Sequence, residues 1–158
     1  MRIQVEVDDA EIRRALQRLI DAGINPRPAL LEIGDDLIVS TKKRFESESG
    51  PDGMPWARNS ELTKSRKGGR DQPLIGGGKL MDQINKQLSG NDTLYVGSDR
   101  DYAGTQQFGA KQGQFGRSDR NTPLPWGDIP ARPFIGISDA DEDKIIDIFN
   151  QYLQDQIE

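Results

Sequence analysis

The 158-residue chain contains no cysteine and no histidine. Without cysteine, disulfides, thiolate metal ligands and a cysteine nucleophile are excluded. Without histidine, the chain lacks the commonest general base, the commonest metal ligand and the usual pH switch. No apolar run approaches the roughly 20 residues that a membrane-spanning helix needs. We therefore expect no enzyme, no cofactor and no membrane partner.

Two stretches resemble ligand-binding motifs, but each fails at the positions that carry the chemistry. Residues 76–79 read Gly-Gly-Gly-Lys, but Pro73 stands where a phosphate loop has its first glycine, and Leu80 replaces the magnesium-binding Ser or Thr. The acidic run at 139–143 lacks the glycine and the glutamate that a calcium loop has at its sixth and twelfth positions. No serine lies in a nucleophile-elbow pattern. The sequence thus names no catalytic, cofactor-binding or metal-binding residue.

The composition predicts a modest core with long loops. Only 34% of the residues are hydrophobic, and 17 glycines and 9 prolines are spread through the chain. The mean hydropathy is −0.73. A length of 158 residues fits one domain, which we take to span residues 1–158. Such loops commonly become ordered only against a partner, so we expect residues 47–78 and 109–128 to be mobile in a free subunit.

Hydrophobic periodicity predicts an α+β fold. We expect about four helices packed on a small two- to three-stranded antiparallel sheet, with two long projecting loops at 47–78 and 109–133. The helical pattern covers residues 9–22, 28–47, 80–88 and 139–157, with a further short stretch at 101–108. Extended segments are expected at 3–7, 93–97 and 134–137.

Charge is unevenly distributed in a chain whose net charge is −5. Residues 57–70 hold five cations against one acid, whereas residues 139–158 hold seven acids against one lysine. The two segments could be complementary surfaces between copies, or ordinary solvated charge. The alternative functional hypothesis is a small nucleic-acid-binding module that contacts phosphates through the basic loop. The residues that would contact DNA or another partner are Arg58, Lys64, Arg66, Lys67 and Arg70.

Four stretches in a fixed order carry a family signal. They are Gly53–Trp56, Leu74–Leu80, Tyr102–Gly109 and Ile129–Gly136, the last followed by a helix. In this order the chain, over roughly residues 28–155, resembles the virion-morphogenesis, or tail-completion, family of Mu-like tailed bacteriophages. That family is related to ring-forming head–tail joining proteins. The resemblance implies a structural protein without catalytic residues or cofactor.

The resemblance also implies partners and a location. It implies a tail-completion, tail-terminator or head–tail joining subunit in the neck or tail end of the virion, assembled in the host cytoplasm. The partners would be further copies in a six-fold or twelve-fold ring, other neck, connector or tail-tube proteins, and DNA passing through the lumen.

The segment around residues 129–134 is a candidate interface. Its prolines fix the backbone, and arginine and aromatic residues are enriched in interface anchors. The alternative is that the aromatic residues belong to the core, where they are equally common. Since no periodicity buries Arg132, we expect Arg132→Ala to leave the fold largely intact. The candidate interface residues are Trp56, Tyr102, Phe108, Pro130, Arg132 and Phe134.

Overall fold

The computed structural model of this chain describes residues 9–69, 71, 73–74 and 79–158. The strand expected at 3–7, the cation Arg70 and the glycine run at 76–78 lie outside these residues. The elements follow in the order α1 (Ala10–Asp21), α2 (Arg27–Ser47), α3 (Glu61–Arg66), α4 (Lys79–Asp82), β1 (Ile84–Ser89), β2 (Thr93–Ser98), α5 (Ala103–Phe108) and α6 (Asp139–Ile157). The α+β class is confirmed, with six helices in the described part rather than about four.

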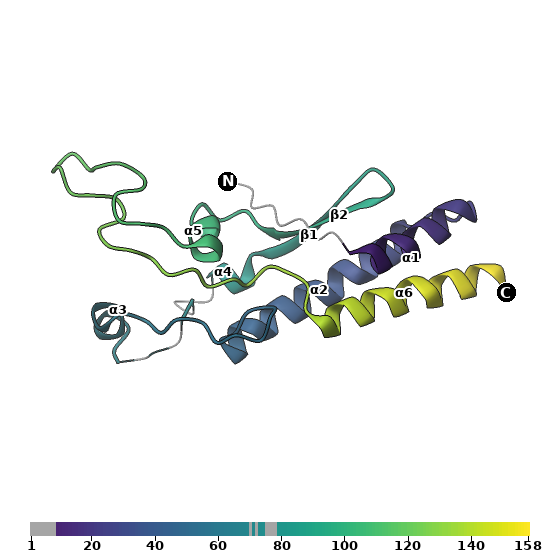
Figure 1. Cartoon of the computed structure of the whole chain (residues 1–158), viewed down its shortest axis with the longest axis horizontal. Coiled ribbons are helices and arrows are strands. Elements are labelled where there is room, and N and C mark those ends of the chain that lie inside the picture. The colour runs from purple at the N-terminus through teal and green to yellow at the C-terminus, as the bar shows by residue number, and fades with distance from the viewer. Residues whose placement is uncertain (1–8, 70, 72, 75–78) are drawn as a thin grey trace.

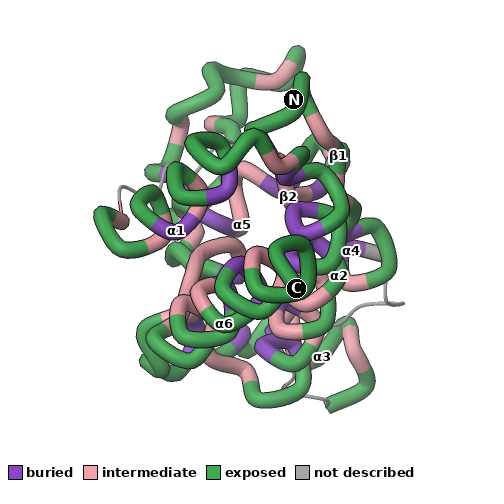
Figure 2. Tube along the Cα trace, turned by 90° about the vertical axis from the view of Figure 1, so that its right-hand side faces the viewer, coloured by how far each residue is buried: buried purple, intermediate pink, exposed green. Residues whose placement is uncertain are grey.

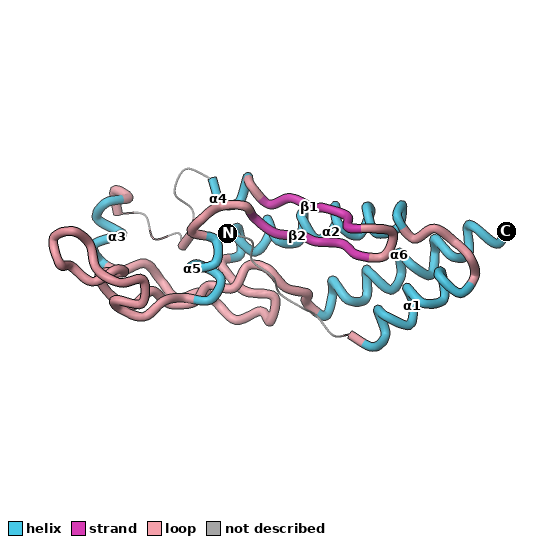
Figure 3. Tube along the Cα trace, turned by 90° about the horizontal axis from the view of Figure 1, so that it is seen from above, coloured by secondary structure: helices cyan, strands magenta, loops and turns pink. Residues whose placement is uncertain are grey.

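Three long helices and one hairpin make the body of the molecule. Helix α1 packs along α6, and α2 packs against both α6 and the β1–β2 hairpin. The two strands are antiparallel, with Ile84 opposite Ser98 and Ser89 opposite Thr93. Figure 1 shows the hairpin on one side of α2 and α6 on the other, with α1 beside α6 at the far end from α3. Figure 3 shows the same elongated arrangement from above.

Local sequence signals set the ends of the helices. The carboxylate of Asp9 caps α1 by accepting hydrogen bonds from the N–H groups of Glu11 and Ile12, both at 2.9 Å. At α6, the Ser138 hydroxyl accepts from the N–H of Asp141, and the Asp141 carboxylate accepts from the N–H of Ser138. This reciprocal pair is a capping box, which a serine followed three residues later by an acidic residue favours.

Glycine at position 34 lets the hairpin approach α2 closely. A Cβ atom there would lie 2.8 Å from Cδ of Lys86 and 3.2 Å from Cδ1 of Leu94. A side chain at this position would therefore force the side chains of Lys86 and Leu94 to shift. The atoms that approach Gly34 belong to side chains of both strands.

The core consists of two clusters at successive positions along α2. The first joins α1, the N-terminal half of α2 and α6. The second surrounds the C-terminal end of α2 and includes Phe45, Trp56, Ile84 and Phe134. Figure 2 shows the buried stretches facing inward, between the helices and the hairpin, beneath an outer surface that is mostly exposed.

Two local expectations were wrong. Residues 80–88 were expected to form one helix, but α4 ends at Asp82 and β1 begins at Ile84. Ile84 and Leu88 are four residues apart, as on a helical face, but in β1 the same spacing places both on its inward face. Residues 134–137 form no strand. Within the expected loop at 47–78, the described residues include the short helix α3.

Residues 110–129, hereafter the arm, form a paired loop that extends away from the body (Figure 1). Ala110 and Ile129 exchange backbone hydrogen bonds of 2.9 and 2.7 Å at its base. Further out, the N–H of Phe115 donates to the carbonyl of Leu124 at 2.7 Å, and Ser118 donates to Thr122 at 2.9 Å. The arm therefore has a backbone geometry of its own. Its mobility in the free subunit stays a prediction.

Candidate assembly surface

Residues 129–136, hereafter the strap, lead from the arm to α6 without belonging to any helix or strand. Polar side chains from segments distant in sequence form hydrogen bonds with the backbone of the strap instead. The carboxamide oxygen of Gln107 accepts from the N–H groups of Phe134 and Ile135 at 2.9 Å each, and its nitrogen donates to the carbonyl of Ile135 at 2.9 Å. The indole N–H of Trp56 donates to the carbonyl of Pro133 at 2.7 Å.

Two of the candidate interface aromatics lie in the core. Trp56 is 3% exposed and Phe134 is fully buried. Both pack on Phe45, with ring centroids 5.4 and 5.5 Å away. Within the subunit, then, Trp56 and Phe134 anchor the strap to the end of α2.

Arg132 is also buried, contrary to the expectation from sequence. It is 8% exposed. Its Nε donates to the carbonyl of Ala57 at 2.7 Å and its Nη2 to the carbonyl of Arg58 at 2.9 Å. Burial lowers the pKa of the guanidinium, although the charge of Asp71 opposes that change. Arg132 thus ties the strap to the loop before α3, and a role at an interface stays a prediction.

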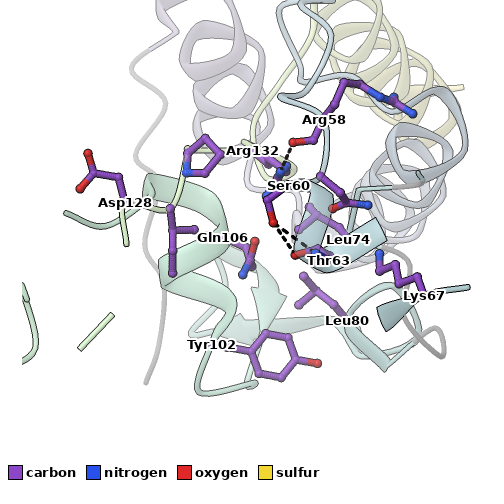
Figure 4. A pocket seen from close by; sticks show the side chains of 13 residues that line it. Arg58, Ser60, Thr63, Lys67, Leu74, Leu80, Tyr102, Gln106, Asp128 and Arg132 are labelled. Atoms are coloured by element: carbon purple, nitrogen blue, oxygen red, sulfur yellow. Dashed lines mark hydrogen bonds between the residues drawn. The ribbon is translucent and has the colours of Figure 1, made fainter. Parts of the chain in front are cut away.

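A cleft of about 730 Å³ opens between α3, α5 and the strap (Figure 4). Several of the residues that the sequence singled out line it together: Arg58, Lys67, Tyr102, Pro130 and Arg132. The cleft wall also holds Asn59, whose side-chain nitrogen is buried without a hydrogen-bond partner among the described residues. The site combines hydroxyl, amide and guanidinium groups with apolar walls.

Two of the five cations of the basic loop, Arg58 and Lys64, pair with acids of the same chain. Arg58 forms ion pairs with Glu48 and, at 3.2 Å, with Asp71. Lys64 lies 3.1 Å from Glu61 and 3.4 Å from Asp71. Burial would raise the pKa of Asp71, but the N–H of Asn59 and the cations together lower it. Hydrogen bonds to Glu48 and Asp71 raise the pKa of Arg58. Because of these ion pairs, Arg58 and Lys64 are less available to bind nucleic-acid phosphates than the sequence alone indicated.

The remaining predicted aromatics are exposed, and the arm adds two more exposed aromatics that were not expected from the sequence. Tyr102 and Phe108 are 42% and 61% exposed. In the arm, Phe115 is 56% and Trp126 is 70% exposed. The signal that could have identified the arm residues is their place in a loop rich in glycine and proline, where no periodic partner buries them. The surface thus offers aromatic contacts at the arm and on α5.

The described residues include no group of three or more Asp or Glu that could hold a metal ion. Within the same part of the chain, no helix has the length and apolar character needed to cross a membrane. The groups that these residues offer to a ligand or partner are the exposed aromatic side chains and the polar side chains that line the cleft.

Comparison with known proteins gives a consistent result. A family model described as the phage virion morphogenesis family matches residues 7–154. The chain is also 31% identical over 153 residues to the Mu-like prophage FluMu G protein 2 of Haemophilus influenzae, and the match covers 96% of each chain. No solved structure matches significantly.

Proposed function

The chain belongs to the phage virion morphogenesis family, and from that membership we propose that it is a non-enzymatic subunit of the neck or tail end of a tailed phage. The subunit completes the tail or joins it to the head, and it works as one member of a closed ring. Six or twelve copies would form the ring. Its neighbours would be connector or tail-tube proteins, with DNA passing through the lumen.

The observation that carries this proposal is the arm. Its backbone hydrogen bonds hold a defined geometry away from the body, yet Phe115 and Trp126 are more than half exposed. Exposing large aromatic side chains to water is unfavourable in free energy, and groups of exposed aromatic side chains mark interaction sites. A subunit that buries these side chains against neighbours fits the assembly role of the family.

The nucleic-acid alternative has less support. A phosphate-binding loop needs cations that are available to the nucleic acid. Here Arg58 and Lys64 are engaged by Glu48, Glu61 and Asp71. The basic loop therefore fits a role in holding the cleft wall together better than a role in binding DNA.

The experiment is deletion of the coding sequence in the phage, with complementation by the wild-type chain and electron microscopy of the particles. We expect unjoined heads and tails, or tails without a proper end, in the deletion, and a ring of this chain at the neck or tail end after complementation. Normal particles in the deletion, or isolated single copies in the virion, would refute the proposal. Salt-sensitive DNA binding by the monomer would favour the alternative.

A further inference from the structure

The two ends of the subunit differ in chemistry. Figures 1 and 3 agree that the arm lies at one end of the long axis, whereas α1 and α6 run side by side to the other end. We call this second end, formed by the last turns of α1 and α6, the helical end. Because a cyclic ring joins different surfaces of neighbouring copies, it requires two complementary patches on each subunit.

The arm presents aromatic and cationic side chains. Phe115, Leu124 and Trp126 are 56%, 41% and 70% exposed. Near the tip, the sequence carries two cations, Arg117 and Arg120, and one acid, Asp119. Further in, Lys111 lies 3.8 Å from Asp128, and the two charges offset each other. The outer part of the arm is therefore apolar with a small positive excess.

The helical end presents aliphatic and acidic side chains. Ile20 in the last turn of α1 is 42% exposed, and Ile157 at the end of α6 is 69% exposed. The last turns of the two helices and the residue that follows α6 carry three acids, namely Asp21, Asp155 and Glu158. Arg18 is the cation in these turns, and its guanidinium donates to the side chain of Asn150 on α6 at 3.3 Å. The helical end is therefore apolar with a negative excess.

We infer that the arm of one subunit packs on the helical end of the next copy. This inference rests on the proposed function, since it names the contact that would close the ring. Aromatic side chains on aliphatic ones give the buried centre, and arginines facing carboxylates give a charged rim. Because the two patches lie at opposite ends of one molecule, their contact is head-to-tail and leaves a free patch on each side for the next subunit.

The absence of cysteine makes a direct cross-linking test possible. Asp119→Cys places one thiol near the arm tip, and Gln156→Cys places one in the last turn of α6. Both positions are exposed. We expect a short bis-maleimide to link the two variants when they are mixed, and to give no covalent dimer with either variant alone. The experiment is run on the purified oligomer, and on complemented particles if the free protein is monomeric.

Substitutions test the two components of the contact. Trp126→Ser should weaken self-association by about tenfold or more, since buried tryptophans are common anchors. The matched control is Val39→Ser, which removes a side chain that is 52% exposed on α2 away from both ends. Arg120→Glu and Asp155→Arg should each weaken association, and their combination should partly restore it, as a coupled pair does in a double-mutant cycle.

The outcomes separate this inference from the proposed function. Oligomers whose arms cross-link only to each other, or not at all to the helical end, overturn the head-to-tail contact but leave the ring intact. Loss of association in Val39→Ser equal to that in Trp126→Ser also overturns it. If the chain occurs singly both in solution and in particles, then the proposed ring itself fails. Binding of the arm to another virion protein alone would likewise overturn the inference.

Discussion

Arg44 is the most informative position at which to perturb the fold. This arginine of α2 is 5% exposed and sits at the junction of α2, the strap and α6. Its Nη1 donates to the carbonyls of Phe134 at 2.9 Å and Gly136 at 3.2 Å. Its Nη2 forms an ion pair with Asp141, the residue that completes the capping box of α6. One guanidinium thus joins three segments that are far apart in sequence.

The Arg44→Met variant should be strongly destabilised. Methionine fills part of the space but leaves the Asp141 carboxylate, which is 11% exposed, without its counter-ion. Breaking a buried ion pair from one side costs roughly 3–5 kcal/mol. The carbonyls of Phe134 and Gly136 also lose a charged donor. Against a total stability of about 5–15 kcal/mol, this loss is a large fraction. For a domain of this size it corresponds to a decrease in melting temperature of roughly 6–20 °C.

The assay is thermal and urea unfolding followed by circular dichroism, with Lys43→Met as the matched control. Lys43 is the preceding residue of the same helix, and its side chain is exposed. We expect Lys43→Met to melt within about 2 °C of the wild type, because exposed substitutions rarely exceed about 0.5 kcal/mol. Arg44→Lys should be intermediate, since lysine keeps the charge but not the planar fork. If Arg44→Met melts as Lys43→Met does, then the strap is not held by this junction.

Three further predictions concern the strap and the first turns of the helices. Gly109→Ala should lose roughly 2 kcal/mol or more in urea unfolding, because φ is 73° and ψ 179° and a Cβ would lie 2.6 Å from the carbonyl oxygen of Ile129. Arg132→Ala should lose about 3 kcal/mol in the same assay, since two part-buried carbonyls lose a charged donor. The hydrogen bond with Asp9, followed by burial and nearby acids, raises the pKa of Glu142 above 4.5, so the folded state binds this proton more tightly than the unfolded state. The stability that the proton confers is therefore present at low pH and lost as the pH rises through the raised pKa. Glu142→Gln should melt higher than the wild type at pH 7, with the difference vanishing toward pH 4.

Each of these predictions has a matched control in the chain. Gly127→Ala adds a Cβ where no atom lies within 4 Å and should cost little compared with Gly109→Ala. Arg66→Ala removes an exposed arginine of α3 and should leave stability nearly unchanged. Glu32→Gln removes an exposed carboxylate of α2 and should not reproduce the pH-dependent gain. A variant that behaves like its control contradicts the contact assigned to it.

The parts of the fold that depend on neighbouring residues could be predicted from the sequence. The capping of α6 by Ser138, the start of α2 near Pro28 and the strand at 93–97 all follow from side chains within a few positions. The boundary between α4 and β1 could not be predicted, because the apolar pattern of residues 80–88 fits both helix and strand. There the packing of the hairpin on α2 decides the conformation.

The burial of the strap depends on partners that are distant in sequence. Arg132 finds its acceptors at residues 57 and 58, and Arg44 finds two of its acceptors at residues 134 and 136. No periodicity marks such contacts, so an arginine between prolines looked exposed. The ion pairs of Arg58 and Lys64 with Asp71 could not be predicted for the same reason, because Asp71 follows α3 in the sequence and has no periodic relation to either cation.

The polar composition of the chain and the buried strap have a common physical explanation. A buried segment with no neighbouring strand must satisfy its N–H and C=O groups in some other way. Here long polar side chains do so: Arg44, Trp56 and Gln107 together pair with the backbone from Pro133 to Gly136. Because these side chains come from α2, α5 and the loop between α2 and α3, they fix the direction in which the strap leaves the body. The arm ends where the strap begins, so the same hydrogen bonds hold the segment that follows the arm against α2 and α5. In the ring that we propose, each subunit would have to hold its two contact patches at a constant angle, and the buried polar contacts of the strap would contribute to that rigidity.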